Sequence, residues 1–216
     1  MIVIFDLDGT LLNTIDDLGY ACNHALEHTG YPTHPIQAYP AKVGNGINNL
    51  IRRALPETER TEENILRVRK YFVPYYDVHN CDYTRPYEGI LGLLTSLKSR
   101  HHLLAVASNK YQAATEKIVN HFFPGLFDII LGEREGVPRK PDPQIVTDIL
   151  RLSGTKTGTD QKVVYIGDSL VDRDTARNAD IPFIACSWGF VPREQLISAD
   201  IPTIVDRPSD IQNLLS

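Results

Sequence analysis

Two aspartates stand at the end of the first apolar segment of the chain, and they are the first candidates for chemistry. Asp6 and Asp8 directly follow the apolar run 2–5, and Gly9 comes next. Side chains two residues apart in extended backbone point the same way, but a bend at Gly9 can turn the Asp8 side chain aside. One carboxylate can then attack phosphorus while its neighbour transfers protons. The pair is therefore a candidate for covalent catalysis assisted by a general acid and base.

Other polar side chains stand at the ends of further apolar runs. In open α/β sheets, ligands bind beyond the carboxyl ends of the strands, so groups that follow different strands can meet at one edge. We expect four carboxylates, one hydroxyl and one ammonium to converge there. The groups are Asp6 and Asp8 after 2–5, Ser108 with Asn109 after 103–107, Lys140 after 128–131, and Asp168 with Asp172 after 163–166.

The charges of this set indicate a metal ion. Two like charges about 4 Å apart repel by roughly 4 kcal/mol even at an effective dielectric constant near 20. Four carboxylates beside Lys140 alone would therefore not all ionise together. A hard divalent cation resolves the conflict, and oxygen ligands with retained waters and a substrate phosphate suit Mg²⁺. Such a cation also offsets phosphate charge, so we predict a Mg²⁺ site that holds a phosphorylated substrate.

The elements that must position these residues follow from the hydrophobic pattern. Short apolar runs alternate with amphipathic stretches, which is typical of a doubly wound α/β domain with a parallel sheet. The nearly continuous apolar runs are expected of strands that are buried on both faces. The predicted strands are 2–5, 103–107, 128–131, 163–166, 183–186 and 203–205, and the predicted helices of the core are 90–99, 113–122, 143–152 and 170–179.

One long interval interrupts the alternation. Between Asp6 and Leu103 only helical patterns occur, at 15–28, 47–55 and 62–76. A right-handed crossover between parallel strands requires a single helix, so the additional helices predict an insertion. We therefore expect an α/β catalytic core formed by 1–14 and 85–216, and an all-helical cap formed by 15–84.

Composition narrows the classes of partner. The chain has 216 residues, and 22 Lys and Arg against 27 Asp and Glu give a net charge of −5. This balance argues against a nucleic-acid partner, which normally requires clustered basic residues, but it allows a small anionic substrate. The apolar run at the start is too short for a signal segment or a membrane span. The oligomeric state is not predictable from these features.

The three cysteines indicate the compartment. Cys22, Cys81 and Cys186 are odd in number and lack the spacing of a metal site, so neither a disulfide framework nor a zinc site is expected. Buried or partly buried thiols are typical of a reducing compartment. We therefore expect a cytoplasmic protein with no membrane partner.

Four segments resemble, in order, the motifs of the haloacid-dehalogenase-like hydrolase superfamily. They are Asp6-Leu7-Asp8-Gly9-Thr10-Leu11, Ser108-Asn109, Lys140-Pro141 and Gly167-Asp168-Ser169-x-x-Asp172. The resemblance spans most of the core and implies a Rossmann-like core with a helical cap inserted after the first motif. It also implies that Asp6 is the nucleophile, which forms an aspartyl-phosphate, and that Asp8 is the general acid and base.

The same resemblance implies the ligand set. Mg²⁺ would be held by the Asp6 carboxylate, the Asp8 backbone carbonyl and Asp168, and Asp172 would assist through water or through Lys140. Ser108, Asn109 and Lys140 would bind the substrate phosphate.

Further segments are similar to the phosphoglycolate phosphatase branch of the superfamily. They include the cap segment 43–47 and the late segments 172–179 and 187–190. The resemblance makes 2-phosphoglycolate the leading substrate and makes Gly44, Asn45 and Gly46 candidates for substrate specificity in the cap. Turn chemistry explains the Gly44–Gly46 loop equally well, as a flexible start of a helix. Asp180 departs from the branch, whose members usually carry Gly there, and Asp tolerates the left-handed backbone less easily.

Three alternatives to a phosphatase remain open at this point. Asp8 favours phosphoryl transfer over dehalogenation, because dehalogenases of this superfamily lack a proton-handling aspartate at that position. A phosphomutase or a pyrophosphatase of the superfamily would retain the same motifs. A non-catalytic regulatory relative would retain the fold, although the intact set of polar residues argues against it.

Overall fold

The computed structural model describes residues 1–154 and 162–215, and it divides the chain into two compact units. One unit comprises Met1–Leu12 together with Pro86–Ser216, and the other comprises Asn13–Arg85. Residues 155–161 and 216, which the predicted core 85–216 includes, lie outside the described residues.

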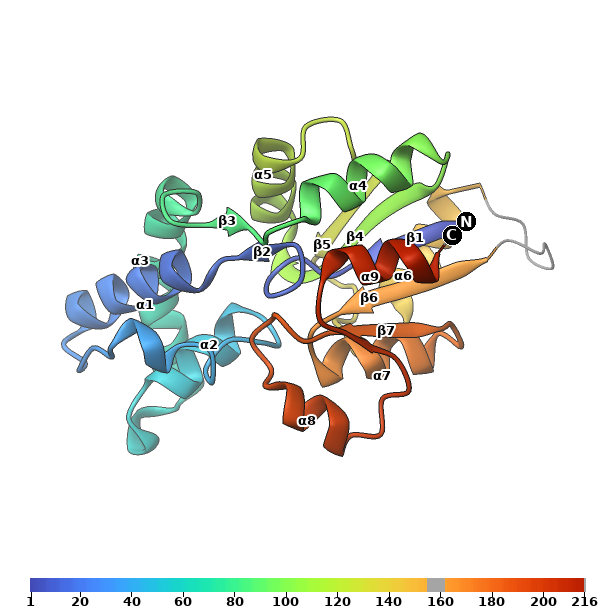
Figure 1. The fold of residues 1–216 in the computed structure, drawn as a ribbon. Coiled ribbons are helices and arrows are strands. Elements are labelled where there is room, and N and C mark those ends of the chain that lie inside the picture. The colour runs from blue at the N-terminus through green and yellow to red at the C-terminus, as the bar shows by residue number, and fades with distance from the viewer. Residues whose placement is uncertain (155–161, 216) are drawn as a thin grey trace. The chain divides into compact units, whose positions relative to one another are not determined.

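The first unit is built on a six-stranded sheet in the order β5-β4-β1-β6-β7-β8, and its paired strands run parallel (Figure 1). This arrangement confirms the predicted α/β class with a doubly wound, Rossmann-like parallel sheet. The strands are β1 (Ile2–Phe5), β4 (Leu103–Tyr111), β5 (Ile129–Glu133), β6 (Val163–Gly167), β7 (Phe183–Cys186) and β8 (Ile204–Val205).

The apolar runs explain why β1 lies in the middle of the sheet. All four residues of β1 are buried, and the strand pairs with β4 on one side and β6 on the other. Its side chains at Ile2 and Ile4 belong to one core cluster with Ile145 and Val146 of α6 (Gln144–Leu152) and Ala176 of α7 (Leu170–Asn178). A central strand covered on both faces has no solvent-facing side, which is why its sequence shows no polar alternation.

Helices connect the strands, and Figure 1 shows α9 on the near side of the sheet. The predicted helices between the strands are present, and each of their ends lies within one residue of the predicted end. Two short helices near the carboxyl terminus, α8 and α9, were not predicted, because their apolar pattern covers less than two turns. The helices of this unit are α4 (Ile90–Ser99), α5 (Gln112–Phe122), α6 (Gln144–Leu152), α7 (Leu170–Asn178), α8 (Arg193–Ser198) and α9 (Pro208–Leu214).

The predicted end of the second core strand was wrong. The apolar pattern stops at Ala107, but β4 continues to Tyr111. Pairing with β5 shifts within this stretch: Ala107 lies opposite Leu131 and Tyr111 lies opposite Glu133, so the intervening residues form an irregularity. Such bulges bend a strand and redirect side chains next to active sites. The polar residues 108–110 can belong to the strand because they form hydrogen bonds and an ion pair within the folded unit.

The second unit contains three α-helices, α1 (Ile15–Thr29), α2 (Ile47–Ala54) and α3 (Glu62–His79), and α1 packs against α3. Asp17 of α1 is 2% exposed, and its carboxylate accepts hydrogen bonds from Thr84 N at 2.8 Å and Thr84 Oγ1 at 2.7 Å. This contact ties the last residues of the unit back to its first helix.

Two short strands stand where the chain passes between the units. The strands β2 (Leu12–Asn13) and β3 (Arg85–Pro86) form a separate two-stranded sheet, which the sequence pattern did not predict. Two residues are too few to show a period of two, so no hydrophobic alternation could reveal them.

Across the described ranges 1–154 and 162–215, no helix combines the length and the apolar content that a membrane span requires.

Candidate active site

Three carboxylates meet beyond the carboxyl ends of two neighbouring strands. Asp6 follows β1, Asp168 follows β6, and Asp172 lies in the first turn of α7. One carboxylate oxygen from each residue lies within 4.8 Å of the others, and all three residues are buried. Parallel pairing of β1 with β6 brings their carboxyl ends to the same edge, which is why residues more than 150 positions apart meet here.

Lys140 lies among these carboxylates. Its Nζ is 2.8 Å from Asp6 Oδ1 and 2.7 Å from Asp172 Oδ1, and the residue is 5% exposed. The ammonium also donates to Ala107 O at 2.9 Å and lies 3.0 Å from the hydroxyl of Tyr165. A buried ammonium is stable only when it is surrounded by acceptors, and this one has a complete set. The sequence pattern does not single out Tyr165 as a site residue, because a tyrosine within a buried strand such as β6 is usually part of the core.

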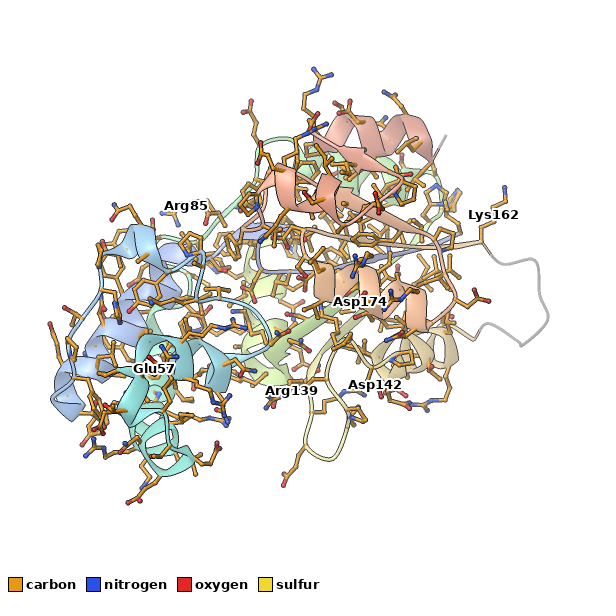
Figure 2. The ribbon with its side chains drawn as sticks, turned by 90° about the horizontal axis from the view of Figure 1, so that it is seen from below. Glu57, Arg85, Arg139, Asp142, Lys162 and Asp174 are labelled. Atoms are coloured by element: carbon orange, nitrogen blue, oxygen red, sulfur yellow. The ribbon has the colours of Figure 1, made fainter. Side chains whose placement is uncertain are left out.

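Figure 2 shows on which side of the core the Lys140 loop lies. The labelled Arg139 and Asp142 flank this loop, whereas the labelled Lys162, directly before β6, lies at the opposite end of the unit. The loop therefore belongs to the carboxyl edge of the sheet.

The side chain of Asn109 fixes the backbone of this loop. Its Nδ2 donates to Lys140 O at 3.1 Å, and its Oδ1 accepts from Lys140 N at 3.0 Å. The two bonds hold the backbone N–H and C=O of Lys140 against the bulged part of β4. Asn109, predicted as a phosphate-binding residue, thus uses its side-chain amide to place the lysine.

Asp172 links this ammonium to the start of α7. Its Oδ2 accepts hydrogen bonds from Ser169 Oγ at 2.5 Å and Ser169 N at 3.1 Å, while its Oδ1 accepts from Lys140. Ser169 and Asp172 form a reciprocal capping box at the helix terminus. The carboxylate is therefore oriented from two sides.

Glycines let the backbone approach Asp168. A Cβ atom on Gly9 would lie 2.4 Å from Asp168 Oδ2, and one on Gly189 would lie 2.2 Å from Asp168 Cβ. Gly9 also has a positive φ of 88°, which favours glycine independently. Asp168 in turn accepts hydrogen bonds from Phe190 N at 2.7 Å and Thr10 Oγ1 at 3.2 Å. The late segment 187–190 therefore forms a wall of the carboxylate cluster.

The electrostatics of the cluster favour a bound cation. Burial, followed by repulsion from Asp172, raises the pKa of Asp6 well above its usual range, although Lys140 opposes the shift. The same two causes raise the pKa of Asp168 to about 7. Burial is the larger cause, and the repulsion from Asp172 shows that Lys140 does not offset the charge of every carboxylate when all are ionised. A buried, all-oxygen donor set with unbalanced negative charge fits a hard divalent cation such as Mg²⁺.

A second buried ammonium pairs with Asp8. Lys110 Nζ lies 2.9 Å from Asp8 Oδ1, and Lys110 is 8% exposed. The sequence pattern indicates Lys140 as a cation at this edge but does not indicate Lys110. Its position directly after Ser108-Asn109 was the available signal, but the predicted end of the strand at Ala107 gave no reason to expect its side chain at this edge.

Ser108 lies at the same bulge and is 2% exposed. Its Oγ accepts a hydrogen bond from Lys110 N at 3.1 Å. The hydroxyl hydrogen can then be donated to a phosphoryl oxygen.

The residues Gly44, Asn45 and Gly46 belong to the second unit, not to the unit that contains the carboxylates. They have consecutive positive φ values of 110°, 61° and 83°, and they precede α2. Arg53 of that helix donates to Val43 O and Gly44 O, each at 3.0 Å. The backbone conformation by itself therefore explains why glycine and asparagine occur here.

The chain is similar to known proteins over most of its length. The family model for haloacid dehalogenase-like hydrolase matches residues 3–186. A phosphoglycolate phosphatase of Mesorhizobium japonicum is 32% identical over 197 residues, which cover 89% of this chain and 85% of the relative. A phosphoglycolate phosphatase of Aquifex aeolicus is 30% identical over 216 residues, which cover 99% of this chain and 96% of the relative.

A solved structure extends the similarity to three dimensions. A crystal structure from Lactobacillus delbrueckii subsp. bulgaricus, provisionally named a phosphoglycolate phosphatase, superimposes with a TM-score of 0.91 and 34% identity. The match covers 99% of this chain and 97% of that one. The similarity to phosphoglycolate phosphatases indicated by the sequence motifs is confirmed. The chain belongs to the haloacid dehalogenase-like hydrolases.

Proposed function

We propose that this hydrolase is a Mg²⁺-dependent phosphatase that cleaves a small phosphate monoester, with 2-phosphoglycolate as its leading substrate. The observation that carries the proposal is the buried cluster of Asp6, Asp168 and Asp172 around Lys140. Relatives that cover nearly the whole chain at about 30% identity are phosphoglycolate phosphatases, which supports the choice of substrate.

In the first step, Asp6 is the nucleophile. One of its carboxylate oxygens attacks phosphorus, and the bond between phosphorus and the ester oxygen breaks. Asp8 gives a proton to that oxygen, so the leaving group departs as an alcohol. The product on the protein is an aspartyl-phosphate.

In the second step, Asp8 acts as a base. It takes a proton from water, the water oxygen attacks phosphorus, and the bond between phosphorus and the Asp6 oxygen breaks. Inorganic phosphate is released and both carboxyl groups return to their starting states. The division of labour depends on the two aspartates having different partners: Asp6 contacts Lys140 and Asp8 contacts Lys110.

The remaining site residues bind and orient the phosphate. We assign Ser108, the backbone near Asn109, and the ammonium of Lys140 to the phosphoryl oxygens, in agreement with their location at the edge. The carboxylates of Asp6 and Asp168 and the backbone carbonyl of Asp8 would hold Mg²⁺, with Asp172 in support. The ion would supply positive charge that offsets the charge of the phosphate.

The proposal includes a role for each part of the chain. Residues 1–14 and 85–216 form the catalytic core, and residues 15–84 form a cap that selects the substrate. The order of the chain supports this division, because the insertion begins directly after the nucleophile loop. A small phosphorylated metabolite is the partner, and the odd number of cysteines favours the cytoplasm as the location.

The test is a panel of phosphorylated metabolites assayed with the purified full chain and Mg²⁺. We expect phosphate release, with the highest kcat/KM for 2-phosphoglycolate. A preference for another ester would overturn the substrate and leave the phosphatase activity intact. Absence of phosphate release from every ester would overturn the proposed phosphatase activity. Transfer of phosphate between positions of a sugar phosphate, stimulated by a sugar bisphosphate, would instead identify a mutase.

A further inference from the structure

The two buried ammonium groups at the carboxyl edge contact different aspartates. Lys140 lies against Asp6 and Asp172, at 2.8 and 2.7 Å. Lys110 lies against Asp8 at 2.9 Å, and the two side chains are only 4% and 17% exposed. Burying an ammonium is costly unless a fixed partner compensates, so such a pair holds both side chains in place. The orientation of Asp8 therefore depends on Lys110, which the mechanism above names as the partner of Asp8 but to which it assigns no role of its own.

The backbone of Lys110 is anchored without help from its side chain. Its N donates to Ser108 Oγ at 3.1 Å, and its O accepts from Thr115 Oγ1 at 3.0 Å. The carbonyl also packs closely against Gly132, where an added Cβ would lie 2.5 Å from Lys110 O. These contacts use only main-chain atoms of Lys110, so replacing its side chain leaves the bulge of β4 supported.

We propose that Lys110 is a positioning residue for Asp8. Its ammonium holds the Asp8 carboxyl group where it can reach the ester oxygen in the first step and water in the second. Proton transfer requires donor and acceptor within hydrogen-bond distance, and small displacements of a catalytic group cause large losses in rate. The inference rests on the proposed phosphatase function and adds a residue to it.

The leaving group of the substrate separates this role from others. An alkoxide is a poor leaving group and needs the proton that Asp8 supplies, whereas 4-nitrophenolate leaves without one. In Lys110→Met, single-turnover cleavage of 2-phosphoglycolate should slow by about 10²-fold because Asp8 is displaced. Single-turnover release of 4-nitrophenol from 4-nitrophenyl phosphate should change by less than about threefold, since that step does not require the proton.

Several variants make the experiment specific. Lys110→Arg keeps a cation and should recover most of the alkyl-ester rate, and Lys110→Gln provides a second neutral side chain. Asp8→Asn should show the same dependence on the leaving group. Adding Lys110→Met to Asp8→Asn should cause no further loss of rate, because both changes remove the same contribution, proton transfer by a correctly placed Asp8. Lys98→Met is the matched control, since Lys98 forms an ion pair with Asp128 at 2.5 Å elsewhere in the unit. It should leave both rates unchanged.

Each outcome decides the proposal. Equal losses for both esters, an increase in KM for both esters, or no change in either would overturn the positioning role of Lys110. Additive losses in the double variant would also overturn it. If Lys110→Met does not fold, as judged by its melting curve, Lys110→Gln and Lys110→Arg decide the question. A wild-type chain without phosphatase activity would overturn the proposed function itself, whereas an active wild type with equal losses overturns only the role of Lys110.

Discussion

The carboxyl edge of the sheet in the first unit and the Gly44–Gly46 loop of the second unit both carry distinctive sequence motifs, but for different physical reasons. At the edge, Asp6 and Asp168 are buried, and their identity matters through charge. In the loop, three consecutive residues have positive φ, and their identity matters through backbone conformation. In this protein the edge motifs therefore matter through buried carboxylates, whereas the loop motif matters through its left-handed backbone.

Replacing Asp6, the proposed nucleophile, should have the largest effect. Asp6→Asn should lower kcat by about 10⁴-fold or more, because an amide cannot form the acyl phosphate. The melting temperature should stay close to that of the wild type. Asp142→Asn is the matched control: Asp142 is an exposed aspartate near Lys140, labelled in Figure 2, and it should retain full activity. More than a trace of turnover by pure Asp6→Asn, with deamidation excluded, would contradict the assignment.

Removal of the metal should have the next largest effect. EDTA should abolish activity and Mg²⁺ should restore it, because the carboxylates at the edge otherwise repel a phosphate. Ca²⁺ should inhibit, since its larger radius and looser coordination disturb in-line attack. Steady-state assays after chelation measure this directly. Full activity in the chelated protein would contradict the inference that the carboxylates at the carboxyl edge require a bound cation.

The stabilising effect of Mg²⁺ should depend on pH. Burial and then Asp172 raise the pKa of Asp168 to about 7, above the value of about 3.9 for an unfolded aspartate. A raised folded pKa favours the protonated carboxyl, so the metal-free fold loses stability as pH rises from about 4 to about 7. Mg²⁺ must displace that proton, and the rise in melting temperature it causes should be larger near pH 8 than near pH 6. Equal shifts at both pH values would contradict competition between Mg²⁺ and a proton at Asp168.

A smaller effect tests the loop. Asn45→Gly keeps the backbone conformation at φ 61° and removes a side-chain Oδ1 that is buried without a hydrogen-bond partner among the described residues. If the loop contributes to specificity, this change should alter the ratio of kcat/KM for 2-phosphoglycolate and a generic small ester by about tenfold. An unchanged ratio would mean that the loop only starts α2. Gly46→Ala is the conformational contrast, and at φ 83° it should destabilise the fold by about 1 kcal/mol.

The smallest expected effect is on the free energy of unfolding, and it concerns the backbone conformation of Asp180. Asp180, which follows α7 with a φ of 54°, is exposed, and its N donates to Arg177 O in the turn that ends the helix. The predicted left-handed conformation at this position is confirmed. Asp180→Gly should stabilise the fold by about 1 kcal/mol, because glycine adopts this conformation without strain. Thermal denaturation should show a rise of about 2–4 °C, and Asp180→Ala should show a fall.

Much of the fold could be predicted from local patterns, because they depend only on neighbouring residues. The continuous apolar runs that became β1 and β6 indicated strands buried on both faces, and the aspartates that follow them lie together at the carboxyl edge. The insertion of helices between Asp6 and Leu103 was visible because a single crossover does not need them. The order of the four motifs indicated the family.

Other features depended on contacts between distant parts of the chain. Two contacts at the site join residues that are far apart in sequence: Lys110 pairs with Asp8, and the hydroxyl of Tyr165 lies beside Lys140. The extension of β4 beyond Ala107, which includes Ser108, likewise depends on the fold around it. No periodicity encodes which buried ammonium faces which carboxylate, since that choice follows from strand order and bulge geometry. The sequence by itself determined the chemical groups and the strands that carry them. Only the tertiary structure decided their partners and their pKa values, because burial and charge pairing arise when distant segments pack together.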